Sequence, residues 1–159
     1  MALTKPALDP QSLEPRTSSF YPEPYRSRVL PREKRQLGNA LGLTRIGINK
    51  TTLPPGKESS MRHFHTLEDE FVYVLSGELV LRTDAGEQIL SAGMCAGFPA
   101  GVEVGHQLVN RGSEDAVYLE VSNRAPGDTA HYTDPDVDML WSPPHAPGQI
   151  THRDGSPYT

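Results

Sequence analysis

The sequence has a single cysteine among its 159 residues and no long hydrophobic run. One cysteine, Cys95, cannot form a disulfide within the chain, which is typical of proteins from reducing compartments. No stretch approaches the roughly 20 apolar residues that a membrane-spanning helix needs, and the N-terminal segment lacks the apolar centre of a secretory signal. We therefore expect a cytoplasmic protein with no membrane partner, in which Cys95 is a small buried hydrophobic residue.

Basic residues are too few and too scattered for a nucleic-acid-binding surface. The formal net charge is -5 at pH 7, and no run of Lys or Arg is longer than two residues. Proteins that bind nucleic acids usually gather their Lys and Arg in a basic patch. We expect no nucleic-acid partner, and a small molecule is the expected ligand.

Proline is scarce in the middle of the chain, where glycine is frequent. Twelve of the fifteen prolines lie in residues 1–31 and 126–157, whereas eleven of the fourteen glycines lie between Gly38 and Gly112. Proline is poorly tolerated inside a sheet, and glycines at short intervals mark turns between strands. The pattern predicts an all-β domain at 41–124, an irregular N-terminal arm at 1–40 and a C-terminal arm at 125–159. The arms carry aromatic residues, so we expect them to pack on the barrel or on a partner subunit.

The middle region is also almost without helical periodicity. Residues 43–53 are β-branched and roughly alternating, and residues 70–90 are predicted to turn at Ser76-Gly77 and again at 84–86. Two further strands are expected on either side of a turn at residues 111–115. Many short strands with close turn signals favour a sandwich or a barrel.

One short stretch gathers residues that bind metals. His63 and His65 are one residue apart, and Glu70 follows them closely. Residues i and i+2 of a strand point to the same side, so both imidazoles are directed into one small volume. Imidazole and carboxylate together suit divalent manganese, iron, zinc, nickel or cobalt. Glu68 and Asp69 have the same chemistry as Glu70, but we expect them to be solvated loop residues.

This stretch resembles the first motif of the cupin superfamily, G-x5-H-x-H-x(3,4)-E-x6-G. His63, His65, Glu70 and Gly77 match it in register. Gly56 stands six residues before His63 instead of five.

A later stretch resembles the second cupin motif, G-x5-P-x-G-x2-H-x3-N, with four residues instead of two between the second glycine and the histidine. The matching residues are Gly93, Pro99, Gly101, His106 and Asn110. The resemblance covers residues 44–123 and implies a double-stranded β-helix, or jelly-roll barrel. It also implies that His63, His65, Glu70 and His106 bind one divalent transition metal ion. The histidines of the C-terminal arm, His131, His145 and His152, are expected to face solvent.

The alternation of strand residues predicts which side chains face the barrel interior. If Glu70 points inward, Val72 and Val74 share its face, while Phe71, Tyr73 and Leu75 point outward. Such an outer apolar face, together with the aromatic arms, predicts a homodimer. Tyr118 and Glu120 also share a face, and a position at the pocket is an alternative for them, but we expect them on the surface. Asn110 and Gly77 are interpreted as turn and strand-packing residues.

The whole pattern looks like that of small single-domain bacterial cupins provisionally labelled sugar-phosphate isomerases. The resemblance implies a metal-dependent enzyme that acts on a small oxygen-rich metabolite through an enediol. The alternatives are an iron(II) dioxygenase, a metal-dependent decarboxylase or lyase of a small organic acid, and a non-catalytic sensor that binds a small molecule. The sequence does not identify a general base, and its candidates for binding a phosphate, Arg45, Arg62 and Arg82, are scattered.

Overall fold

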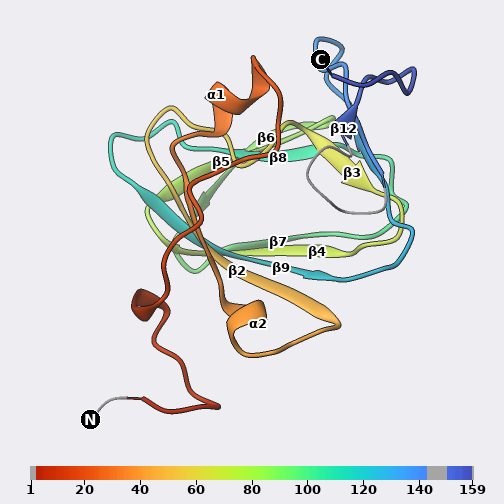
Figure 1. The fold of residues 1–159 in the computed structure, drawn as a ribbon. Helices are drawn as coiled ribbons and strands as arrows, with labels where there is room; N and C mark the ends of the chain where they lie inside the picture. Colours follow the sequence, from red (N-terminus) through yellow and green to blue (C-terminus); the bar gives the residue numbers. More distant parts are fainter. Residues whose placement is uncertain (1–2, 143–149, 159) are drawn as a thin grey trace.

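Two β-sheets face each other in the computed structural model, which describes residues 3–142 and 150–158 (Figure 1). The first sheet has five strands and the second has seven. Within the described residues, helix is limited to three short segments, so the structure is all-β as the sequence predicts. These segments are η1 (Pro10–Ser12), α1 (Tyr25–Val29) and α2 (Leu37–Ala40).

The chain passes repeatedly from one sheet to the other, which is the arrangement expected of a double-stranded β-helix. The first sheet contains, in spatial order, β1 (Glu33–Gln36), β2 (Ile46–Leu53), β9 (Ala116–Asn123), β4 (Glu70–Ser76) and β7 (Cys95–Phe98). The second contains β12 (Ile150–Thr151), β11 (Leu140–Trp141), β10 (Ala130–Tyr132), β3 (His63–His65), β8 (His106–Val109), β5 (Glu78–Thr83) and β6 (Gly86–Ser91).

Strand β4 alternates between the barrel interior and the outside as predicted. Val72 and Val74 are buried, whereas Phe71, Tyr73 and Leu75 are 39–41% exposed. The strand lies between β9 and β7 and pairs with both in antiparallel fashion. Its first residue and its two buried valines therefore share the inner face of the sheet.

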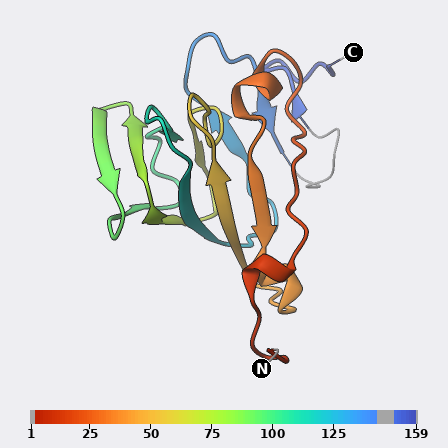
Figure 2. The ribbon, with the colours of Figure 1, turned by 90° about the vertical axis from the view of Figure 1, so that its left-hand side faces the viewer.

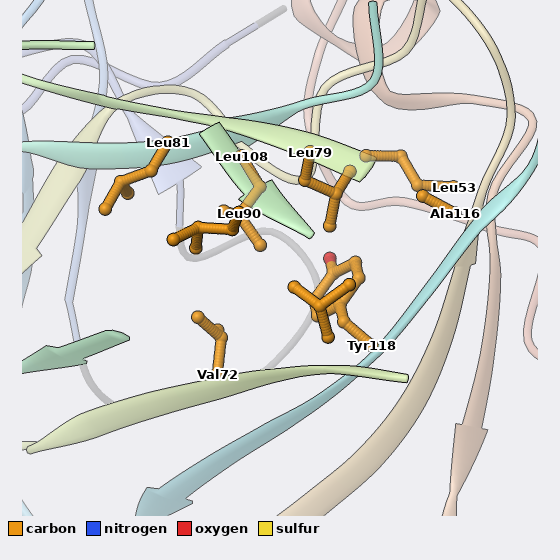
Figure 3. Close-up of a cluster of buried hydrophobic side chains, with 9 residues drawn as sticks. Leu53, Val72, Leu79, Leu81, Leu90, Leu108, Ala116 and Tyr118 are labelled. Atoms are coloured by element: carbon orange, nitrogen blue, oxygen red, sulfur yellow. The ribbon is translucent and has the colours of Figure 1, made fainter. Parts of the chain in front are cut away.

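A hydrophobic core fills the space between the two sheets (Figure 3). It lies toward the end of β4 that leads into Gly77, so the other end of the strand is left for polar groups. Burying one such Leu or Val side chain stabilises the fold by about 1.5–3 kcal/mol. The members of the core are Leu53, Val72, Val74, Leu79, Leu81, Leu90, Leu108, Ala116 and Tyr118.

Gly77 joins β4 to β5 in a conformation that only glycine adopts readily. Its φ is +76°, and a Cβ added there would lie 2.9 Å from both Ala116 Cα and the Asp115 carbonyl oxygen. Asn110 is fully buried, and its Nδ2 donates to the carbonyl oxygens of Leu53 and Glu114. Both residues thus have the turn and packing roles that the sequence predicts.

The two arms are more regular than their proline content suggests. Strand β1 of the N-terminal arm extends the first sheet, and β10 to β12 of the C-terminal arm extend the second. The N-terminal segment runs along one side of the barrel (Figure 2). Side chains of both arms also pack against the barrel residue Met61 in a second buried cluster. The arm residues in that cluster are Tyr21, Tyr25, Val29, Tyr132, Val137, Met139 and Ile150.

Cys95 is exposed, and the expectation that it is buried is wrong. It lies on β7 opposite Tyr73 of β4, so both side chains occupy the outer face of the first sheet. No helix in the described parts of the chain is long and apolar enough to cross a membrane.

Candidate metal centre

Strands from both sheets bring the motif residues together at one end of the barrel. His63 and His65 are the first and last residues of β3, and His106 begins β8 directly opposite His63. Glu70 begins β4 in the facing sheet. The structure therefore gathers all four of the residues that the sequence motifs single out.

The carboxylate of Glu70 lies at the centre of the three imidazoles. Its Oε2 is 2.7 Å from His106 Nε2 and 3.7 Å from the Nε2 atoms of His63 and His65. The ring of His63 lies 5.0 Å from that of His65 and 4.9 Å from that of His106, between centroids. All three histidines thus direct the same nitrogen toward one carboxylate.

Two of the imidazoles are held in place through their other nitrogen. His63 Nδ1 lies 2.8 Å from the carbonyl oxygen of Met61, and His65 Nδ1 lies 2.5 Å from Oδ2 of the fully buried Asp128. Donation from Nδ1 leaves the lone pair of Nε2 available. The sequence does not single out Asp128, because this residue is far from both motifs in the chain. The one local indication is its place directly after Pro126-Gly127, which predicts a turn.

Burial and mutual electrostatics set the protonation of the cluster. Burial lowers the pKa of His63 to about 3, so this imidazole is neutral at physiological pH. Burial alone would raise the pKa of Glu70. The hydrogen bond from His106 and the fields of His63 and His65 outweigh it, and the pKa of Glu70 is lowered overall. His63 is therefore a neutral imidazole and Glu70 an ionised carboxylate, the forms in which these groups bind metals.

The donor set fits a divalent transition metal ion. His63, Glu70 and His106 have ligand atoms within 4.8 Å of one another, and His65 Nε2 faces the same carboxylate. Imidazole nitrogen with a single carboxylate is a donor set for iron, manganese, zinc, nickel or cobalt. The ring of Phe98 stacks on His106 at 3.6 Å between centroids and fixes the plane of that imidazole.

The acidic neighbours of Glu70 have structural contacts of their own. Asp69 is exposed and accepts a hydrogen bond from the Ala100 backbone at 2.7 Å. Glu68 is half-buried, accepts from the Ala125 backbone at 3.0 Å, and lies near His65 and Asp128 in a second group of ligand-type atoms. Both are thus more than solvated loop residues.

His131 and His152 of the C-terminal arm lie apart from this cluster. His131 is exposed as expected and stacks on Phe64. His152 is half-buried, and its Nδ1 lies 2.7 Å from Asp138. His145 lies outside the described residues.

A cavity of about 260 Å³ adjoins the cluster on the side of β9 and β2. Glu120 lines it and Tyr118 is fully buried beside it, so the expectation that both lie on the surface is wrong. The physical reason is that β9 lies between β2 and β4 in the middle of its sheet, where the face shared with Glu70 and Val72 is the inner one. Burial also raises the pKa of Tyr118, so its phenol stays protonated.

The cations that line this cavity are not those the sequence suggested. Arg62 is paired with Asp134 at 2.6 Å, Arg82 is paired with Glu87 at 3.3 Å, and Arg45 is exposed. The cations at the cavity come instead from the N-terminal arm, namely Arg16, Arg32 and Lys34.

A second cavity, of about 440 Å³, adjoins the cluster on the side of β5, β6 and β7. Its walls include the apolar side chains of Leu81, Leu90, Val102 and Val104. The cluster thus lies between two cavities. We call the first the polar cavity, because the charged side chains of Arg16, Arg32, Lys34 and Glu120 are in its wall.

Comparison with known proteins agrees with this geometry. The family model described as "Cupin domain" matches residues 49–122. A solved structure from Silicibacter pomeroyi, named as a sugar phosphate isomerase from a cupin superfamily, is 44% identical, has a TM-score of 0.89 and aligns over 97% of each chain. A protein of Acidithiobacillus ferrooxidans, provisionally assigned as a sugar phosphate isomerase, is 30% identical over 80% of each chain, with a TM-score of 0.69.

A more distant structure shares the fold alone. It is a predicted oxalate decarboxylase from Thermotoga maritima, 21% identical, with a TM-score of 0.60 over 75% of this chain and 99% of its own. No curated protein matches the sequence significantly. The near full-length likeness at 44% identity, the domain match and the observed double-stranded β-helix together show that the chain belongs to the cupin superfamily.

Proposed function

We propose that this protein is a metal-dependent isomerase of a small, phosphorylated, oxygen-rich metabolite, of the sugar-phosphate isomerase type. The observation that carries the proposal is a second carboxylate, Glu120, in the cavity beside the four candidate ligands. The protein from Silicibacter pomeroyi, which bears the name of that activity, supports the reaction class.

The four candidate ligands His63, His65, Glu70 and His106 would hold one divalent ion. Such an ion supplies a Lewis acid that polarises a carbonyl oxygen and stabilises the negative charge that develops during proton transfer. Because Nδ1 of His63 and of His65 is already engaged, these two imidazoles need no reorientation to bind it.

We assign the proton transfer to Glu120. Glu120 of β9 pairs with Val72 of β4, and Glu70 pairs with Ser122. The two glutamates are therefore offset by two residues along the strands, and both face the barrel interior. Two residues of a strand span about 7 Å, enough for a substrate carbon to lie between them. Lys34 Nζ and Asn49 Nδ2 both donate to Oε1 of Glu120, at 2.5 and 3.1 Å.

In this account, the carboxylate of Glu120 takes a proton from one substrate carbon and returns it to the neighbouring carbon. The hydroxyl proton moves between the two oxygens, so the isomer gains and loses no atoms. Lys34 and Asn49 hold the carboxylate at the cavity wall through these two hydrogen bonds. Loss of a general base of this kind typically lowers the rate about 10²- to 10⁴-fold.

The test is exchange of substrate hydrogen with solvent deuterium in metal-loaded protein, followed by NMR over a panel of phosphorylated aldoses and ketoses. We expect exchange and isomer formation in the wild type and a loss of about 10²-fold or more in Glu120→Gln, with metal content unchanged. Glu103→Gln, at an exposed loop position, is the matched control. Wild-type rates in Glu120→Gln, or oxygen uptake in place of exchange, would contradict the proposal.

A further inference from the structure

Two arginines of the N-terminal arm line the polar cavity and lack a carboxylate partner. Arg32 is only 6% exposed and Arg16 is half-buried. Neither forms an ion pair with any residue in the described part of the chain, and the Nε atoms of both are buried there with no hydrogen-bond partner. Buried guanidinium groups are normally paired, so these two are the exceptions that call for a ligand.

The strand register explains why these cations face inward. Lys34 pairs with Thr51 of β2, which pairs in turn with the buried Tyr118 of β9. Arg16 lies opposite Lys34 in an isolated bridge, and Arg32 precedes Lys34 by two residues. Residues opposite each other, and residues two apart, share a face of a sheet. The arm therefore adds three cations to the inner wall of the barrel.

The charges of this wall do not cancel. Lys34 Nζ lies 2.5 Å from Oε1 of Glu120, so each of these two neutralises the other. The other carboxylate that lines the cavity, Glu70, faces the three imidazoles, so Arg16 and Arg32 are left as two like charges on this part of the wall. Burial and the neighbouring charge of Arg32 lower the pKa of Arg16, and the attraction of Glu120 offsets this lowering only in part. An arginine nevertheless remains charged at any physiological pH. Two unneutralised charges in a partly buried cavity are costly unless an anion accompanies them.

We propose that Arg16 and Arg32 form an anion subsite that binds the phosphate group of a phosphomonoester substrate. The proposal deepens the proposed function and rests on it for the other end of the substrate, whose oxygens would face the candidate ligands. A phosphomonoester carries close to two negative charges at neutral pH and so matches two guanidinium groups, whereas a carboxylate carries one. The guanidinium fork also suits the oxygens of a phosphate group.

The subsite lies in the wall of the same cavity as the candidate metal centre. Four paired residues form one row across the first sheet, namely Lys34, Thr51, Tyr118 and Val74. Along the strands, this row is four residues from the row that contains Glu70. Every second residue faces inward, and two residues of a strand span about 7 Å. The side chain of Lys34 reaches back to Glu120 on the intermediate row. A short phosphorylated chain can therefore contact both ends of the cavity and pass Glu120 between them. The ring of Phe20 lies 5.1 Å from the guanidinium carbon of Arg16 and holds it at the cavity wall.

The experiment is calorimetric titration of metal-free protein with inorganic phosphate at low ionic strength. We expect Arg16→Gln and Arg32→Gln each to weaken phosphate binding about tenfold or more, because each removes charge-assisted donors. Acetate, the carboxylate probe, should bind the wild type more weakly than phosphate. Arg45→Gln is the matched control, since Arg45 is exposed and does not line the cavity, and it should keep the wild-type affinity.

Arg32 also donates to the Ser59 carbonyl oxygen, so Arg16→Gln provides the decisive variant if Arg32→Gln fails to fold. No phosphate binding by the wild type, unchanged binding by Arg16→Gln, or equal weakening by Arg45→Gln would overturn the subsite. Acetate binding as tight as that of phosphate would overturn the choice of phosphate. Elemental analysis of the same proteins after reconstitution with a divalent metal separates the two proposals. Phosphate binding by wild-type protein that takes up no metal would leave the subsite standing and remove the proposed function.

Discussion

Nδ1 of His65 lies 2.5 Å from Oδ2 of Asp128, and the side chain of Asp128 is fully buried. The other oxygen of Asp128 accepts the Leu67 backbone N–H at 2.8 Å, so one carboxylate holds both the imidazole and the loop that leads to Glu70. A buried carboxylate behind a histidine fixes the tautomer of the ring and makes its free nitrogen a better ligand. The candidate centre therefore depends on a residue of the C-terminal arm.

Replacing Asp128 should weaken metal binding without removing a ligand. Asp128→Asn keeps an oxygen for the Leu67 N–H but removes the negative charge behind His65. We expect metal affinity to fall about 10- to 100-fold, measured by competition with a chromogenic chelator. Asp138→Asn is the control, because it alters a similar pair with His152 away from both cavities. Equal affinities for the two variants would show that Asp128 does not support the centre.

Acid should destabilise the metal-free protein through His63. Its pKa is about 3 when folded, against an ordinary value of 6.5, so the unfolded chain binds the proton more readily between these values. The folded state is therefore favoured fully above pH 6.5 and loses stability as the pH falls from 6.5 toward 3. At pH 5 the loss from this group is about 2 kcal/mol.

Urea unfolding at pH 7 and pH 5 measures this effect. His63→Gln cannot take up the proton when it unfolds, so its free energy of unfolding should fall less between the two pH values than that of the wild type. The difference should be about 2 kcal/mol. Identical pH dependence in both proteins would mean that His63 is not held neutral by burial.

The outer face of β4 leads us to propose that the protein forms a homodimer. Phe71, Tyr73 and Leu75 lie along it, each 39–41% exposed. Burying these side chains against a second copy would remove apolar surface from water. Light scattering at micromolar concentration should give twice the mass of one chain, and Tyr73→Lys should shift the protein toward monomer. Ile89→Lys, exposed in the other sheet, should not. A monomeric wild type would contradict the proposal.

The strand pattern and the motif spacing predicted the barrel and the meeting of the four motif residues. Period-two alternation placed Val72 and Val74 inside, and the glycine at position 77 is required by its positive φ. These features are local, because each depends on residues close together in the chain. His106 was located by the motif alone, and the β3–β8 pairing explains its position opposite His63.

The polar cavity could not be predicted in the same way. Arg16 and Lys34 face inward because of a bridge between two segments of a proline-rich arm, which carries no alternating pattern. Asp128 reaches His65 across 63 residues of sequence, and no local signal links them. Glu120 was expected on the surface because the sequence of one strand does not show which of its faces the other sheet will cover. The positions of these residues could not be predicted because they depend on contacts between segments that are distant in the chain.

The metal content of untagged protein, purified without chelator, tests the central claim most directly. We predict about one divalent transition metal ion per chain in the wild type and in Asp69→Asn, and a large loss in Glu70→Gln, which removes the charge at the centre of the three imidazoles. Elemental analysis of the three proteins decides it. Less than about a tenth of an equivalent in reconstituted wild-type protein, or equal losses in both variants, would contradict the account.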